Sequence, residues 1–287
     1  MLAAVQPEAS SSVAEAACAT VLMIAGVTAL AWQVKQARRE PSQGIPAWKG
    51  EWLDFGIWLS AIYCAAYVGI SVFKLCFGNR GVDPADEFGL ILRGSTMHAA
   101  TLAAQLTMLW RWRTWSPWPV NQARYSGKYL FNQAVLAWLA AYPVLAVASW
   151  VWQWIIHVVH QPTAPLQQAV QFLGHASSPK QVTVLIVFAG VIAPINEELF
   201  FRAGLYRFIK SRMPAGYALV AVNLLFAAAH ANLLSFLPLF ILGVLLTRLY
   251  ERCGNIAAPI AFHALFNLTN MAVILLFPDT ASPLNSP

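Results

Sequence analysis

The sequence predicts an all-α fold, a polytopic membrane helical bundle of about eight transmembrane helices, from its composition and its hydropathy pattern. Of the 287 residues 59% are hydrophobic and only 10% are charged, and the mean hydropathy is +0.57. Soluble domains carry roughly 25% charged residues. The longest polar stretches, residues 33–51 and 158–181, have the length of loops. We therefore expect one domain that lies within a lipid bilayer.

Eight apolar segments, separated by polar or proline-containing connections, account for most of the chain. A helix needs about 20 apolar residues to cross the hydrocarbon core. The expected helices cover residues 13–32, 52–77, 89–112, 129–157, 182–206, 215–233, 235–250 and 256–277. The seventh of these is short, so a re-entrant pair with the sixth is an alternative there.

Basic residues indicate how these helices are oriented. With the N-terminus outside, 13 of the 18 Lys and Arg residues fall in cytoplasmic segments and four fall outside. Cytoplasmic loops of membrane proteins are enriched in this way. We therefore expect both termini outside and the segments 33–51, 113–128 and 207–214 in the cytoplasm. The first 12 residues contain no Lys or Arg, so segment 13–32 is interpreted as a retained helix rather than a signal peptide.

Other features of the sequence are less informative about structure and function. Residues 165–175 place apolar and glutamine side chains on opposite sides at helical spacing, which predicts a short surface helix or an ordered loop. The four cysteines have no CxxC spacing and indicate neither a disulfide framework nor a zinc framework. The net charge of +6 is spread between apolar segments, so nucleic acid is not an expected partner. We expect an integral, multi-pass protein of the plasma (inner) membrane.

Polar motifs interrupt three of the expected helices. The first is Glu197-Glu198-x-x-x-Arg202, the second is Phe226-x-x-x-His230, and the third is His263-x-x-x-Asn267. Ionisable groups at membrane depth are costly and mark functional sites by default. Asn223 lies seven residues before His230 and hence on the same helical face. The remaining histidines, His98, His157, His160 and His175, have no comparable polar neighbours in the sequence.

Helix geometry predicts that the motifs meet. Glu197 and His230 lie at similar distances on either side of the connection near Met213, so they are level on antiparallel neighbours. Adjacent residues of a helix diverge by about 100°, so the two glutamates cannot face one target. Glu198 is spaced to pair with Arg202, which leaves Glu197 as the free carboxylate. Pro194 either opens room for water by kinking the helix or is a packing kink.

These residue types permit two kinds of hydrolysis by activated water. In the first, Glu197 is the general base, His230 shares its proton, and His263 with Asn267 stabilises an oxyanion. In the second, Glu197, His230 and His263 hold zinc with an open fourth position. A covalent nucleophile is not expected, because no serine or cysteine lies at a matching position.

The three motifs resemble those of the CAAX-protease and bacteriocin-processing (CPBP) family, also called the type II CAAX prenyl endopeptidase or ABI family. The resemblance covers about residues 182–275 and matches the EExxxR, FxxxH and HxxxN patterns in order. It implies an eight-helix intramembrane endopeptidase in which Glu197, His230, His263 and Asn267 are catalytic and Glu198 and Arg202 support them. It leaves open whether zinc is required and whether the substrate is prenylated.

The predicted organisation has three parts. Residues 1–180 form N-terminal transmembrane helices without a signature, 181–277 form the catalytic membrane core, and 278–287 form a flexible tail. The expected activity is hydrolysis of a peptide bond near the membrane-embedded or C-terminal part of a membrane-associated protein or peptide. The alternative is a non-enzymatic membrane protein with a buried polar core, either a proton-coupled transporter or an immunity or scaffold factor. Internal repeats, which would favour a transporter, were not found.

Overall fold

The computed structural model describes residues 8–39, 44–80, 86–111, 125–160 and 179–276. Within these ranges the secondary structure is helical, which confirms the predicted all-α fold. The surface segment 165–175, the tail 278–287 and most of the loop 113–128 lie outside the described residues. The elements are α1 Glu8–Arg39, α2 Trp52–Phe77, α3 Glu87–Arg111, α4 Gly127–His160, α6 Pro179–Val187, η3 Phe188–Ile192, α7 Ala193–Glu197, η4 Glu198–Tyr206, α8 Arg207–Lys210, α9 Ala215–Ala229, α10 Phe236–Cys253 and α11 Ala257–Leu276.

Elements α6 to α8 follow one another without a break, so the described chain contains the eight helical segments that hydropathy predicts. Four of them are long and apolar enough to cross a membrane: Trp52–Phe77, Gly127–Val159, Pro179–Lys210 and Ala257–Leu276. Many large apolar side chains on α2 and α4 face outward, among them Tyr63, Leu75 and Trp150. An outward apolar surface is what a lipid environment requires. These features support an integral membrane protein.

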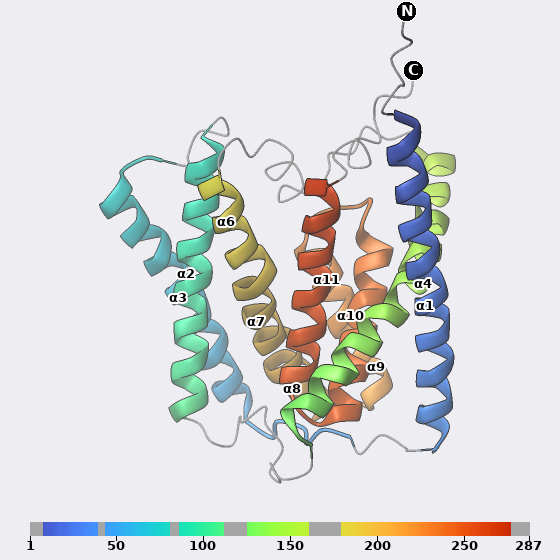
Figure 1. Ribbon diagram of the computed structural model, residues 1–287. Coiled ribbons are helices and arrows are strands. Elements are labelled where there is room, and N and C mark those ends of the chain that lie inside the picture. The colour runs from blue at the N-terminus through green and yellow to red at the C-terminus, as the bar shows by residue number, and fades with distance from the viewer. Residues whose placement is uncertain (1–7, 40–43, 81–85, 112–124, 161–178, 277–287) are drawn as a thin grey trace, which may run out of the picture.

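The helices alternate in direction along the chain and stand side by side (Figure 1). The segment α6–α8 lies centrally in this view, with α2 and α3 on one side and α11, α10 and α4 on the other. Helix α4 packs against α1, α10 and α11, and α9 packs against α10. The main apolar core joins α4, α10 and α11 through residues such as Leu145, Leu246 and Phe262.

One boundary differs from the prediction in a way that matters for the site. The sequence placed His230 inside a helix over 215–233, but α9 ends at Ala229 and His230 is its C-cap residue. The next residue, Ala231, has a φ of 49°, in the left-handed region, and this conformation ends the helix. The imidazole therefore projects from the end of α9 rather than from its side.

Candidate active site

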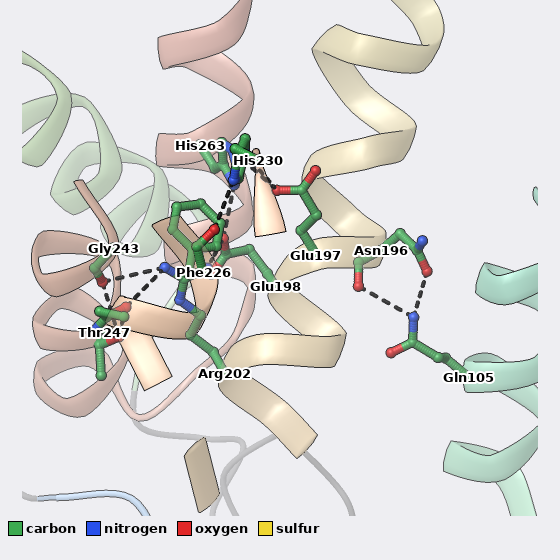
Figure 2. A network of polar contacts seen from close by, with 11 residues as sticks. Gln105, Asn196, Glu197, Glu198, Arg202, Phe226, His230, Gly243, Thr247 and His263 are labelled. Carbon is green, nitrogen blue, oxygen red and sulfur yellow. Dashed lines mark hydrogen bonds and ion pairs between the residues drawn. The ribbon is translucent and has the colours of Figure 1, made fainter. Parts of the chain in front are cut away.

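The central segment α6–α8 is not a uniform α-helix. Two stretches of π-helix, η3 and η4, enclose the single turn α7, and the paired glutamates lie at the junction of α7 and η4. π-Helical insertions are rare and occur often at functional sites. The widened turn places Glu197 and Glu198 on different sides of the helix (Figure 2). This is the divergence that the sequence predicted.

Glu198 belongs to a fully buried layer of polar contacts. Arg202 donates from Nη1 to Glu198 Oε1 at 2.9 Å, and both side chains are completely buried. The other Nη of Arg202 lies 3.3 Å from Asn223 Oδ1 and 3.3 Å from the Gly243 carbonyl oxygen. The guanidinium also lies 4.3 Å from the centre of the Phe226 ring. The predicted pairing of Glu198 with Arg202 is therefore present, and Arg202 is also held by two neighbouring helices, α9 and α10.

A close approach of α9 and α10 completes this layer. A Cβ atom at Gly243 would overlap Asn223 Oδ1 and crowd the Phe226 ring, so only glycine lets the two helices come together here. Asn223 donates from Nδ2 to the Thr247 hydroxyl at 3.1 Å. Asn223 therefore lies beneath the site, where it orients Arg202. The sequence placed it on the same helical face as His230.

Glu197 belongs to a second, more open layer. Its Oε2 atom lies 3.9 Å from His230 Nε2 and 3.9 Å from His263 Nε2. The side chains of Glu197 and His230 are 23% and 25% exposed, whereas that of His263 is 4% exposed. Glu197 Oε2 itself is buried and has no hydrogen-bond partner among the described residues. The structure therefore brings together three of the four residues that the sequence predicted to be catalytic (Figure 2).

Hydrogen bonds on the far side of both rings fix which nitrogen carries the proton. His230 Nδ1 lies 2.8 Å from the Phe226 carbonyl oxygen, which can only accept, so Nδ1 donates. His263 Nδ1 lies 2.8 Å from Glu198 Oε1, which Arg202 keeps paired as a carboxylate, so this Nδ1 also donates. In the neutral state each ring therefore turns the lone pair of Nε2 toward Glu197. Two lone pairs and a carboxylate oxygen face each other, and a donor such as water or a proton is required between them.

Asn267 lines the same cavity but also has a structural contact. It donates from Nδ2 to the Ala189 carbonyl oxygen at 2.8 Å. The amide of Ala193 bonds to Phe188, so the next bond in this register would run from residue 194 to Ala189. Pro194 has no N–H to give. Asn267 therefore satisfies the carbonyl that Pro194 leaves open, with one of its two amide hydrogens.

These residues open onto a cavity of about 530 Å³ between α3, α4, the α6–α7 segment, α10 and α11. Apolar side chains such as Leu145, Leu185 and Met271 line most of it, and the polar groups Glu197, His230, His263 and Asn267 lie in its wall. Clefts of this size and composition hold apolar ligands and orient them with a few polar groups.

The zinc alternative is only partly matched by this geometry. The two Nε2 lone pairs and the Glu197 carboxylate are suitable donors for zinc. Within the described ranges, however, no group of three or more His, Cys, Asp or Glu side chains is assembled closely enough to hold a metal ion. The 3.9 Å separations of Glu197 Oε2 from the two Nε2 atoms are longer than the separation of about 3.3 Å between neighbouring donors of a tetrahedral zinc site. No chemical step is therefore assigned to a metal.

His98 is the residue that sequence reasoning missed. It has no comparable polar neighbours in the sequence, but the structure places Asn196 of α7 beside it. It lies on α3, lines the same cavity, and its Nδ1 lies 3.1 Å from Asn196 Nδ2. Asn196 directly precedes the paired glutamates, and this was the one available signal. The contact depends on how α3 packs against α7, which a single sequence does not display.

The described site thus consists of paired carboxylates and histidines around an internal apolar cavity of a helical bundle. Residues 179–269 match the family described as Type II CAAX prenyl endopeptidase Rce1-like. This match confirms, for that part of the chain, the resemblance that the three motifs predict. Residues before 179 lie outside it.

One curated relative from Escherichia coli, described as an uncharacterized 24.3 kDa protein, is 34% identical over 87 residues. The aligned region covers 29% of this chain and 39% of the relative's length. No solved structure matches this chain significantly.

Proposed function

We propose that this chain is an intramembrane endopeptidase of the glutamate type. It hydrolyses a peptide bond near the membrane-embedded or C-terminal part of a membrane-associated protein or peptide. The observation that carries this proposal is the buried, unpartnered Glu197 Oε2, which lies 3.9 Å from two histidine nitrogens that both turn lone pairs toward it. The family match over residues 179–269 supports the same class of activity.

In the proposed reaction a water molecule enters from the cavity and bridges Glu197 and a histidine from that side. It donates hydrogen bonds to Glu197 Oε2 and to one Nε2, attacks the peptide carbonyl carbon, and gives its proton to Glu197. Glu197 then passes this proton to the leaving amine as the carbon–nitrogen bond breaks. His230 orients the water, because its Nδ1 is held by the Phe226 carbonyl.

His263 and Asn267 are proposed to stabilise the tetrahedral intermediate, with different requirements. His263 Nδ1 already donates to Glu198, so Nε2 can donate to an oxyanion only when the ring is doubly protonated. Asn267 has one amide hydrogen on Ala189 and keeps the second for the cavity. Glu198 and Arg202 support the site by holding His263 from below.

The cavity supports an apolar substrate segment. Its wall is apolar except for the catalytic groups and a few polar side chains, and it opens between helices that pack within the bundle. Such a space accepts an extended, lipid-soluble chain whose scissile carbonyl reaches Glu197. Whether that chain carries a prenyl group is decided by the test below.

The test uses the full chain, purified and reconstituted into phospholipid vesicles. Peptides with a hydrophobic C-terminal segment, with and without a prenylated cysteine, are incubated with the wild type, Glu197→Ala and His157→Ala. His157 is an exposed control on α4. Mass spectrometry should detect new termini with the wild type and the control but not with Glu197→Ala. Equal cleavage by all three proteins would overturn the proposal.

A metal-dependence arm accompanies this test. A chelator should leave cleavage unchanged if Glu197 and water suffice. Loss of cleavage that Zn²⁺ restores would replace the glutamate-type mechanism with the zinc mechanism but would keep the protease activity. A pH-sensitive dye inside the same vesicles tests the transporter alternative, which requires proton movement that Glu197→Ala abolishes.

A further inference from the structure

A chain of three amide and imidazole groups leads from the α7 backbone to His98. It begins at Gln105 on α3, which is buried and lies about two helical turns beyond His98. Gln105 Nε2 lies 3.2 Å from the Asn196 carbonyl oxygen and also contacts Asn196 Oδ1 (Figure 2). A backbone carbonyl can only accept a hydrogen bond, so the atom of Gln105 that faces it must be the amide nitrogen. This contact fixes the orientation of the Gln105 side chain.

The orientation of Gln105 fixes that of Asn196. Because Gln105 offers its amide nitrogen, the Asn196 atom that meets it must be the oxygen, and Asn196 Nδ2 points the other way. There it donates to the Thr101 hydroxyl at 2.8 Å and lies 3.1 Å from His98 Nδ1. Thr101 uses its own hydrogen on the His98 carbonyl oxygen, so its hydroxyl oxygen is free to accept from Asn196.

The orientation of Asn196 in turn fixes the tautomer of His98. An amide nitrogen only donates, so His98 Nδ1 must accept and carries no proton. The neutral ring therefore has its proton on Nε2. Among the described residues Nε2 has no protein partner, and the His98 side chain lines the cavity together with Glu197. His98 is thus prepared to donate one hydrogen bond to a molecule in the cavity.

The other two histidines of the cavity have the opposite tautomer. The Nδ1 atoms of His230 and His263 donate to the Phe226 carbonyl and to Glu198, so their neutral rings present lone pairs. His98 therefore differs from them in kind. Of the three rings that line the cavity, it alone carries an N–H at Nε2 without taking up an additional proton.

We propose that His98 is a further catalytic residue, which donates from Nε2 to the carbonyl oxygen of the scissile peptide bond and to the oxyanion that forms from it. The inference rests on the proposed peptidase function. Preorganised donors are the groups that stabilise such an oxyanion in a cavity without bulk water. Gln105 and Asn196 are positioning residues in this account, since they act only through the His98 ring.

The first test measures the tautomers and needs no substrate. The full chain is labelled with ¹⁵N-histidine, reconstituted in lipid, and studied by solid-state NMR, with single histidine variants for assignment. His98 should show a protonated Nε2 and an unprotonated Nδ1, and His230 and His263 should show the reverse. A His98 ring that is protonated at Nδ1, alone or together with Nε2, would overturn the inference.

The second test measures binding of a trileucine peptide aldehyde, whose hydrate has the tetrahedral carbon of the proposed intermediate. His98→Leu keeps the approximate size of the ring but has no donor, and His98→Gln keeps an amide donor. The wild type should bind the aldehyde about tenfold more tightly than His98→Leu, as expected for one hydrogen bond. His98→Gln should recover much of the difference, and His157→Leu should match the wild type. Equal binding by wild type and His98→Leu, or no binding by any of them, contradicts the inference.

The third test is turnover of a peptide that the wild type cleaves. Removal of one oxyanion donor lowers kcat by about 10²–10³-fold with little change in KM. His98→Leu should show this loss, and His98→Gln should show a smaller one. A loss confined to KM, or one that His98→Gln shares fully, would assign His98 a structural role. If Glu197→Gln cleaves as the wild type does, the proposed mechanism fails, whereas the NMR and binding results still decide the role of His98.

Discussion

Glu198 Oε1 is the atom on which the buried layer depends. It accepts from Arg202 Nη1 at 2.9 Å and from His263 Nδ1 at 2.8 Å. This one carboxylate oxygen therefore pairs with the positive charge of Arg202 and also sets the tautomer of His263. Glu197, one residue earlier, makes neither contact and faces the cavity instead. The two adjacent glutamates thus have different surroundings, the buried layer for Glu198 and the cavity for Glu197.

The coupling of Glu198 and Arg202 is testable by a double-mutant cycle. Arg202→Ala leaves a buried carboxylate uncompensated and should cost about 3–5 kcal/mol of stability. Glu198→Gln leaves a buried guanidinium and should cost a similar amount. The double variant should be more stable than the sum of the two losses implies, because neither charge is then left alone. Melting in detergent measures all three. Strictly additive losses would show that the two side chains are not coupled.

At this scale the sequence predicts the motif residues better than their surroundings. Glu198 and Arg202 are four residues apart in one helix, so their pairing follows from helix geometry. His98 and Asn196 are 98 residues apart, and their contact exists only because α3 packs against α7. Residue spacing contains no information about such a contact. The tautomer of His98 depends in turn on the orientation of Gln105, a residue that belongs to none of the three sequence motifs.

The central helix is shaped by its π-helical segments and by Pro194. Proline inside an α-helix removes a hydrogen bond and clashes with the preceding turn. Here Pro194 follows η3 and opens α7, where the wider i to i−5 register has already moved the backbone. The unsatisfied group is the Ala189 carbonyl, and Asn267 on α11 occupies it. The last residue of the HxxxN motif therefore connects two helices as well as facing the cavity.

This connection predicts a compensating pair of substitutions. Asn267→Leu should lower stability by about 0.5–1.5 kcal/mol, because the half-buried Ala189 carbonyl then loses this hydrogen bond. Pro194→Ala restores a backbone N–H near that carbonyl. It should therefore offset part of the loss in the Asn267→Leu background.

Thermal unfolding of the two single variants and the double variant tests the connection. As a matched control, Asn270→Leu changes another cavity asparagine of α11. Pro194→Ala should change the thermal stability of the Asn270→Leu variant by the same amount as it changes that of the wild type. If Pro194→Ala restores neither variant, or both equally, Asn267 does not compensate for the missing proline hydrogen.

Element positions are largely predictable from hydropathy, whereas their internal register is not. All eight predicted segments are found as helical segments, and their ends differ by a few residues. The π-helical stretches η3 and η4 were not expected. Their residues, such as Ala189 and Phe200, are ordinary helix residues in a membrane, and the register depends on contacts with other helices. Pro194 indicates that a backbone hydrogen bond is missing, but it does not indicate that the neighbouring turns are π-helical.

For the whole molecule the bundle order is consistent with the predicted orientation. The described start of α1 and the end of α11 lie at the same end of the bundle (Figure 1). The opposite end has several basic side chains, among them Arg207, Lys210 and Arg212. Lys210 forms an ion pair with Glu251 and donates to the Ile45 carbonyl, which ties the segment before α2 to the ends of α8 and α10. The cytoplasmic location of this end stays a prediction.

Cysteine labelling tests that orientation. The four native cysteines are replaced by serine, and single cysteines are introduced at Ser211 and at Asn79, which lie in turns at opposite ends of the bundle. A membrane-impermeant maleimide should label the variant at 79 in intact cells and the variant at 211 only after permeabilisation. Labelling of 211 from outside, with 79 protected, would reverse the predicted topology.

The proposed role of Glu197 as the base that activates water is tested by Glu197→Gln. Glutamine keeps the size of the side chain but cannot take the proton. The measurement is the rate of cleavage of one defined peptide in vesicles, with melting recorded on the same samples. We expect a loss of about 10²–10⁴-fold in cleavage rate, with melting unchanged from the wild type. A folded Glu197→Gln protein that cleaves at the rate of the wild type would contradict the account and remove Glu197 from the reaction.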